Sequence, residues 1–258
     1  MLRLSALCIS KYMKYKEHDI HKSGGYFGKY DDYLGEFVYG GIDGCVTTFA
    51  VVAGAAGAGL SSSIILILGF ANLLADGFAM SVGAYLSAKS GKDNFQKHKQ
   101  IEYWEVDHLP EKEIEEIRDI YRNKGFHGEL LEQVVDVITA DKDRWVSVMM
   151  KEELEMIEEE RSPVYIGLVT YISFLVIGIV PLSSYVADFI FEGIINPFHI
   201  SIALTALGFI FVGAMKSSVT QTSNLRSIGE TLLLGAIAAL VSYYVGDLLE
   251  HIVRSKSV

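Results

Sequence analysis

The chain has 258 residues, of which half are apolar and only 21% are charged, and its formal net charge is −10. An acidic chain is a poor partner for nucleic acid, and so high an apolar fraction argues against an ordinary soluble domain. The charge is also uneven, because the segment 89–161 holds 20 of the 32 acidic and 12 of the 22 basic residues. This split composition predicts membrane spans interrupted by one polar insert.

Five segments with little or no charge are long enough to cross a bilayer, whose hydrocarbon core needs roughly 20 helical residues. A stretch rich in glycine and serine, 57–63, separates the first two, and Pro181 is expected to kink the third. The predicted spans are residues 36–60, 62–88, 162–187, 193–215 and 231–246. We therefore predict an all-α membrane protein with five transmembrane helices and a cytoplasmic three-helix insert between the second and third.

The lysines and arginines beside the span ends set the expected orientation, because cytoplasmic ends are richer in them. The N-terminal segment and the exit from the second span are rich in lysine, whereas the links 57–63 and 188–197 contain neither residue. The N-terminus and the insert are therefore expected in the cytoplasm. The expected organisation is an N-terminal arm in 1–35, two spans in 36–90, a metal-binding insert in 91–162, three spans in 163–253 and a C-terminal tail in 254–258.

The polar insert is expected to form helices at 93–106, 111–123 and 128–160. Its glutamates occur three residues apart, which places both members of each pair on one helix face. Two such faces brought together make a costly cage of like charges unless a cation occupies it. A thioether beside carboxylates suits a borderline transition metal such as Fe²⁺ better than Ca²⁺ or Mg²⁺. The candidate metal ligands are Glu102, Glu105, Glu113, Glu116, Met149 and Glu153; the ordinary alternative is a solvated helix face with a core methionine.

Two aspartates, Asp43 and Asp76, lie inside predicted spans. A charge at mid-bilayer costs at least roughly 2.5–3.5 kcal/mol, so such a residue is a functional candidate by default. Asn72, Asp76 and Met80 follow one another at intervals of four, on one face of the second span. Two carboxylates, an amide oxygen and a thioether are thus placed to converge on one cation; the alternative is that both aspartates lie near the membrane interfaces.

Small residues along the first span are spaced for close helix packing. Gly40, Gly44, Gly54 and Ala58 form this series, and a pair of glycines four residues apart is typical of a helix-pairing face. We expect a two-fold homodimer with the first span at its centre.

Two runs in the first two spans carry a family resemblance: residues 40–54, GGIDGCVTTFAVVAG, and residues 71–90, ANLLADGFAMSVGAYLSAKS. They resemble the vacuolar iron transporter family. The Glu-rich insert, with Trp145 followed by Met149-Met150-Lys-Glu-Glu-Leu154, is similar to that family's cytoplasmic metal-binding domain. The resemblance extends over about residues 34–253, although the last three spans match in hydropathy alone.

The resemblance implies an Fe²⁺/H⁺ antiporter that often also passes Mn²⁺, working as a homodimer with the ion path between the subunits. Asp43 and Met80 match the aspartate and methionine that line the family's path, and the six insert residues match its insert ligands. Some members carry glutamate where this chain has Asn72. Asp76, one turn further, either supports the site or replaces that carboxylate. The membrane is expected to be vacuolar or another endomembrane in a eukaryote, and the cytoplasmic membrane in a prokaryote.

Other function classes have less support in the sequence. The phosphate-binding pattern GxxxxGK[ST] is absent, so no nucleotide is expected and transport would be secondary. An intramembrane aspartyl protease would explain two membrane aspartates, but its GxGD signature is missing, and we expect no enzyme and no resident cofactor. A membrane-anchored metal sensor would explain the acidic insert and leave Asp43 and Asp76 without a role.

Overall fold

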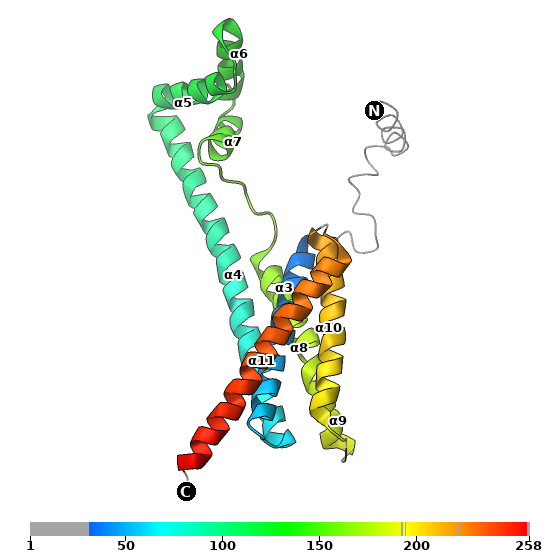
Figure 1. Cartoon of the computed structure of the whole chain (residues 1–258). Coiled ribbons are helices and arrows are strands. Elements are labelled where there is room, and N and C mark those ends of the chain that lie inside the picture. The colour runs from blue at the N-terminus through cyan, green and yellow to red at the C-terminus, as the bar shows by residue number, and fades with distance from the viewer. Residues whose placement is uncertain (1–30, 192, 194, 221, 257–258) are drawn as a thin grey trace, which may run out of the picture. The chain divides into compact units, whose positions relative to one another are not determined.

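The computed structural model describes residues 31–191, 193, 195–220 and 222–256, so the predicted arm 1–35 lies almost wholly outside the described residues. The described residues form helices and no strand (Figure 1). The elements, in chain order, are η1 Asp31–Tyr33, α3 Leu34–Gly57, α4 Ser62–His108, α5 Pro110–Asn123, α6 Gly128–Thr139, α7 Lys142–Glu152, α8 Pro163–Gly178, η2 Val180–Leu182, α9 Ser183–Phe191, α10 Pro197–Thr220 and α11 Asn224–Lys256.

Five helical segments of the described chain are long and apolar enough to cross a membrane, which confirms the predicted number. They are α3, α4 through its apolar first part, the segment Pro163–Phe191, α10 and α11. The third is interrupted at Pro181, where η2 separates α8 from α9. The chain divides into two compact units, residues 1–83 with 164–258 and residues 84–163, which we call the membrane unit and the insert.

The helices of the insert differ from the prediction in two places. Helix α4 runs without a break from the second span through to His108, where two separate helices were expected. The residues between 88 and 93 include no proline, and the single Gly91 costs only about 1 kcal/mol in a helix. The predicted long helix 128–160 is instead two helices, α6 and α7, because Asp141 caps α7 by accepting a hydrogen bond from the Arg144 backbone N–H at 2.8 Å.

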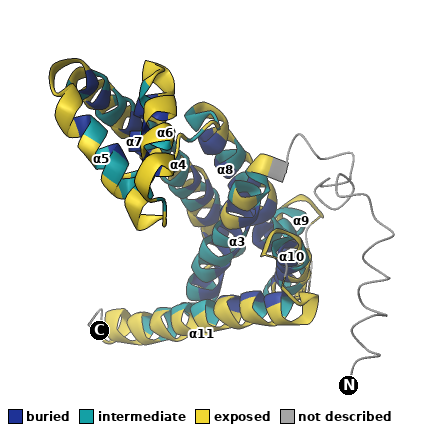
Figure 2. Ribbon diagram, turned by 90° about the horizontal axis from the view of Figure 1, so that it is seen from above, coloured by how far each residue is buried: buried dark blue, intermediate teal, exposed yellow. Residues whose placement is uncertain are grey.

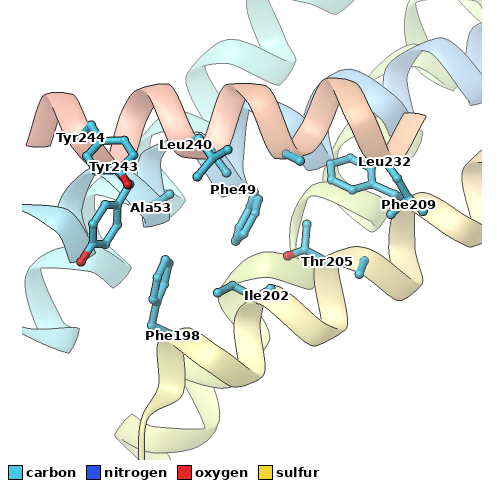
Figure 3. Close-up of a pocket in the computed structure, with 13 residues that line it drawn as sticks. Phe49, Ala53, Phe198, Ile202, Thr205, Phe209, Leu232, Leu240, Tyr243 and Tyr244 are labelled. Atoms are coloured by element: carbon cyan, nitrogen blue, oxygen red, sulfur yellow. The ribbon is translucent and has the colours of Figure 1, made fainter. Parts of the chain in front are cut away.

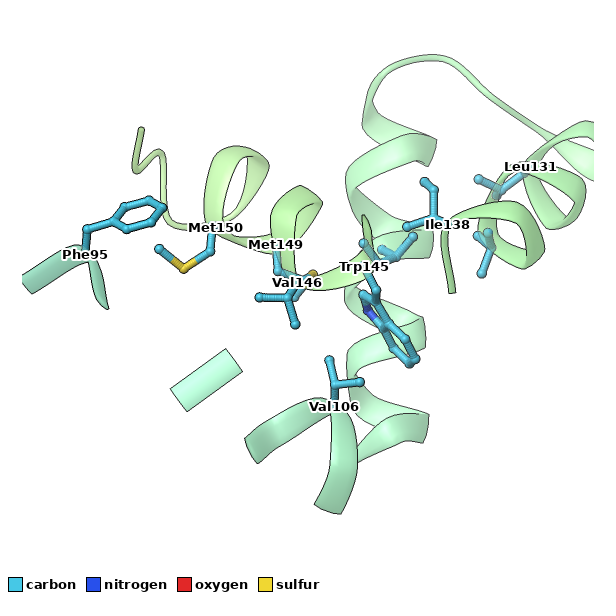
Figure 4. Packing of buried hydrophobic residues seen from close by; sticks show 10 residues of the cluster. Phe95, Val106, Leu131, Ile138, Trp145, Val146, Met149 and Met150 are labelled. Carbon is cyan, nitrogen blue, oxygen red and sulfur yellow. The ribbon is translucent and has the colours of Figure 1, made fainter. Parts of the chain in front are cut away.

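The insert therefore consists of the end of α4 together with α5, α6 and α7, rather than three helices. Its core is built where these four helices meet, and Figure 4 shows Val106 facing Trp145 and Met149. Trp145, Val146 and Met149 are buried, and Ile117 of α5 is fully enclosed. The buried cluster comprises Phe95, Val106, Ile117, Leu131, Val135, Ile138, Trp145, Val146, Met149 and Met150.

The membrane unit is held together by close glycine contacts. A Cβ atom on Gly40 or Gly44 would collide with the backbone of α8, and a Cβ on Gly57 would collide with the backbone of α11 at Tyr243. A Cβ on Gly54 would lie 3.3 Å from the Ser242 carbonyl oxygen of α11. The small residues of the first span thus serve helix packing inside one chain, and the homodimer expected from the sequence stays a prediction.

Much of the apolar surface of the membrane unit is uncovered. Figure 2 shows that α11 is largely exposed along its length. Only 6% of the residues in its most apolar stretch are buried. Side chains such as Leu234 and Leu248 are more than half exposed. In a bilayer such faces contact lipid or another protein, so their exposure is consistent with the membrane assignment.

A groove of about 460 Å³ lies between α3, α10 and α11 (Figure 3). Phe49 of α3, Phe198 and Phe209 of α10, and Leu240 and Tyr243 of α11 are among its lining residues. No charged side chain lines it, and neither do the four candidate transport residues. The groove is therefore a gap between apolar helix faces and not the ion path expected from the sequence.

Candidate functional site

The predicted insert glutamates meet in one cluster. Glu102 and Glu105 are on α4, Glu113 and Glu116 are on α5, and Glu153 directly follows α7. Carboxylate oxygens of Glu102, Glu105 and Glu113 lie within 4.8 Å of one another, and so do those of Glu113, Glu116 and Glu153. Because Glu113 belongs to both groups, the arrangement suits two cations bridged by one carboxylate.

The turn between α4 and α5 brings the two glutamate pairs face to face. The Leu109 N–H donates to the Glu105 carbonyl at 2.7 Å, closing α4. Pro110 then occupies the first turn of α5, where its missing N–H costs nothing. The Glu113 N–H returns to the Leu109 carbonyl at 3.1 Å. One residue therefore separates two helices whose glutamates at three-residue spacing converge.

Two of these carboxylates are buried without partners. Glu102 is 3% exposed and Glu113 is 1% exposed. One oxygen of Glu102 and both oxygens of Glu113 have no hydrogen-bond partner among the described residues. A buried, unpartnered carboxylate is costly unless it is protonated or binds a cation. These orphaned oxygens distinguish the cluster from a solvated helix face.

The electrostatics of the cluster reflect the same crowding. Glu102 is on the polar part of α4, outside its apolar span, and burial, followed by repulsion from Glu153 and Glu105, raises its pKa to about 7. Burial, followed by repulsion from Glu116 and Glu105, also raises the pKa of Glu113 to about 7. Lys112 forms an ion pair with Glu116 at 2.8 Å on the exposed edge and offsets little of this repulsion.

The raised pKa values predict how pH affects the metal-free insert. Glu102 and Glu113 keep their protons up to about pH 7 when folded but lose them near pH 4.5 when unfolded. The unfolded state thus loses protons first as pH rises, so the free energy of unfolding is expected to fall between about pH 4.5 and 7 and to level off above.

Fluorescence of the full-length protein in detergent measures this trend locally, because both tryptophans of the chain, Trp104 and Trp145, lie in the insert. The thermal midpoint should be higher at pH 5 than at pH 7.5, and the difference should shrink in Glu113→Gln, which removes one of the two titrations. A metal-free midpoint that increases from pH 5 to pH 7.5 would contradict the assignment of both carboxyls.

Met149 is placed differently from the glutamates. Its side chain is fully buried in the apolar cluster with Trp145 and Val146 (Figure 4). It lies one turn before Glu153, whose N–H donates to the Met149 carbonyl at 3.0 Å. Met149 therefore supports the helix end that presents Glu153, and its packing in the core accounts for its position.

The four candidate transport residues lie in α3 and α4 of the membrane unit. Asp43 and Asp76 are each partly buried, and the glycine that follows each of them contacts Phe174 of α8. Asn72 lies one turn before Asp76, and its buried side-chain N–H₂ has no hydrogen-bond partner among the described residues. Met80 packs against the apolar cluster that contains Leu73 and Phe174. The structure thus places each aspartate beside a glycine that contacts the same residue of α8.

Two residues near the aspartate pair were not anticipated from the sequence. The Thr48 hydroxyl is fully buried and, unlike that of Thr47, which donates to the Asp43 carbonyl at 2.9 Å, has no described partner. Phe174 of α8 is fully buried and contacts both Gly44 and Gly77. The available signal was the repeated Asp-Gly pair, 43–44 and 76–77, because each glycine marks a close approach beside an aspartate.

The chain is similar to known proteins over most of its length. The model of the VIT family matches residues 34–247. A vacuolar iron transporter of Toxoplasma gondii is 35% identical over 229 residues, covering 86% of this chain and 76% of that protein. One of Plasmodium falciparum is 31% identical over 241 residues, covering 91% and 88%. Vacuolar iron transporter 1 of Arabidopsis thaliana is 28% identical over 217 residues, covering 84% and 86%.

These matches extend over the spans and the insert alike, so they include both the aspartate pair and the glutamate cluster. They also remove the intramembrane protease from consideration, because the matching proteins are transporters and not enzymes. The chain belongs to the VIT family.

Proposed function

We propose that this protein exports Fe²⁺, and also Mn²⁺, from the cytosol across its membrane in exchange for protons. The observation that carries the proposal is the presence of two acidic sites in one chain: a buried glutamate cluster in the insert and two partly buried aspartates in the first two membrane spans. The relatives that match over most of the chain are named vacuolar iron transporters, which supports iron as the cargo.

The insert serves as the collecting site. Its five carboxylates provide anionic oxygen ligands, and their mutual repulsion falls when a divalent cation is bound. Because a ligand must be deprotonated to bind metal, loading releases protons from Glu102 and Glu113. Affinity should therefore rise as pH increases toward and beyond about 7, the pKa that both groups share.

The aspartate pair serves as the coupling site in the membrane. Asp43 carries a proton when no metal is bound, and the metal displaces that proton because it binds the carboxylate. Alternating access to the two sides then moves metal one way and protons the other. The Met80 thioether favours Fe²⁺ over Mg²⁺ and Ca²⁺. Asp76 acts either as a second carboxylate ligand, in place of the glutamate that Asn72 replaces, or as its support.

The lysine distribution supports the direction of transport. The residues of α4 that follow its apolar part include Lys89, Lys92, Lys97 and Lys99. This end of the span is therefore expected in the cytoplasm. The insert then samples cytosolic metal, and the receiving compartment is a vacuole or other endomembrane lumen in a eukaryote and the cell exterior in a prokaryote.

We further propose that the protein works as a homodimer. Since Gly40 and Gly44 pack against α8 inside the chain, the second copy must be contacted by other faces. On the apolar part of α4, Leu74 and Phe78 are 52% and 62% exposed on the helix that carries Asp76. Residues two apart do not share a helix face, so this exposed face lies opposite Asp76 and is available to a second copy.

Cysteine cross-linking tests the dimer in a background without Cys8 and Cys45. Single cysteines at Leu74 and Phe78 should form disulfide-linked dimers in membranes, with reactivity that follows the helical period along α4. A cysteine at Thr170, enclosed between α8 and α3, is the control that should not react. Absence of any cross-linked dimer from α4 would argue against this interface.

Reconstitution into proteoliposomes tests the function directly. Fe²⁺ uptake should be stimulated by a proton gradient directed out of the vesicle lumen, and metal addition should drive proton movement in the opposite direction to the metal. A membrane-anchored sensor would bind metal in the insert without flux. If Fe²⁺ uptake does not depend on the proton gradient, exchange with protons is contradicted, and the protein transports metal without coupling to protons.

A further inference from the structure

Helix α8 contacts α3 and α4 along the same stretch that carries the two aspartates. On the α4 side, the Ser81 hydroxyl donates to the Gly167 carbonyl at 2.8 Å, and a Cβ on Gly77 would lie 2.9 Å from the Phe174 ring. On the α3 side, a Cβ on Gly44 would collide with the Phe174 backbone. One residue of α8 therefore touches both helices directly beside Asp43 and Asp76.

Phe174 is suited to act as a spacer between these helices. It is fully buried, so its ring is enclosed by neighbours and has no solvent-exposed position to move into. Its backbone touches α3 at the residue after Asp43, and its ring touches α4 at the residue after Asp76. Since protein interiors are closely packed, a change in the volume of this ring moves the helix backbones that contact it.

We propose that Phe174 is a positioning residue that sets the separation of the Asp43 and Asp76 carboxylates, and through it the fit of the site to its metal. The proposal rests on the proposed role of these aspartates in transport. Metal sites tolerate only a few tenths of an ångström of misplacement in their ligands, and residues that orient ligands typically affect metal affinity 10–100-fold. Phe174 does not bind the ion itself.

Opposite changes in volume at one contact provide the test. Gly77→Ala adds a methyl group where the ring lies, and Phe174→Leu removes the ring. Each single variant should raise the KM for Fe²⁺ in proteoliposomes roughly 10-fold or more. The double variant should recover most of the parent's KM, because the smaller side chain makes room for the added methyl group.

The control is a similar contact about two turns away along α4, between Gly69 and Leu182. A Cβ on Gly69 would collide with the Leu182 side chain of η2, which resembles the Gly77 contact but lies away from Asp76. Gly69→Ala and Leu182→Val should lower the thermal midpoint and the amount of active protein, and leave the KM and the preference among Fe²⁺, Mn²⁺ and Co²⁺ unchanged. A purely structural Phe174 would behave in the same way.

A second measurement keeps this inference separate from the proposed function. Stabilisation of the detergent-solubilised protein by Co²⁺ is measured in a background that removes the insert site, so that it reports the membrane site. In this background four glutamates of the insert are changed to glutamine: Glu102, Glu105, Glu113 and Glu116. A smaller shift in both single variants, recovered in the double, supports positioning even if the parent shows no flux. An unchanged KM and Co²⁺ shift in Phe174→Leu and Gly77→Ala, or equal changes in the Gly69 control, would overturn it.

Discussion

Asp43→Asn is expected to abolish proton-coupled metal transport while the protein still folds. The substitution keeps the shape of the side chain and removes its titratable charge. If Asp43 is both a metal ligand and the proton carrier, Fe²⁺ uptake and metal-driven proton movement should both fall to the level of protein-free vesicles. The thermal midpoint of the metal-free protein should be close to that of the parent, because asparagine resembles the protonated carboxyl group in shape and in lack of charge.

Three further variants separate the roles within the membrane site. Asp76→Asn should be as severe as Asp43→Asn if it supplies the carboxylate that Asn72 lacks, and milder if it only supports the site. Met80→Leu should alter the preference among metals more than the proton coupling, because a thioether has no proton to exchange. Asp247→Asn, on the half-exposed far part of α11, is the control that should transport normally.

These outcomes are measured as metal-driven proton movement in proteoliposomes at several pH values. Full activity of Asp43→Asn would refute the coupling mechanism. The membrane-anchored sensor would then become the better interpretation, because the insert would retain a function that the spans lack.

Changing the four helical glutamates of the cluster to glutamine together should abolish high-affinity metal binding by the insert. These residues are Glu102, Glu105, Glu113 and Glu116. Loss of four anionic ligands should weaken affinity by well over the roughly 100-fold typical of changing residues that only orient ligands. Above pH 7 and without metal, the insert of the variant should be at least as stable as that of the parent, since the variant no longer buries carboxylates that repel one another.

Quenching of tryptophan fluorescence by Co²⁺ or Fe²⁺ in the full-length protein measures this binding, since both tryptophans are in the insert. The matched control changes four exposed glutamates of the same insert, which keeps the net charge equal: Glu111, Glu129, Glu155 and Glu160. The two quadruple variants should differ sharply. Equal titration curves would show that general acidity, and not the cluster, attracts the metal.

Glu153 shows where sequence reasoning reaches its limit in the insert. The i,i+3 spacing of Glu102 with Glu105, and of Glu113 with Glu116, is a local property of one helix, and the sequence predicted both pairs. That Glu153 joins the second pair depends on how α7 packs against α4 and α5. The same long-range packing placed Met149 in the core, a choice that spacing alone cannot make because ligands and core residues share a helical period.

In the membrane unit, hydropathy and charge alone determined the five spans and identified Asp43 and Asp76, because each span is a continuous local segment and a membrane charge is rare at any position. The sequence also identified small residues on the first span as contact points. Only the tertiary structure decided their partners, which are α8 and α11 of the same chain. A glycine permits close approach by any backbone, so its neighbour is set by the packing of the whole unit, as is the placement of Phe174 beside both aspartates.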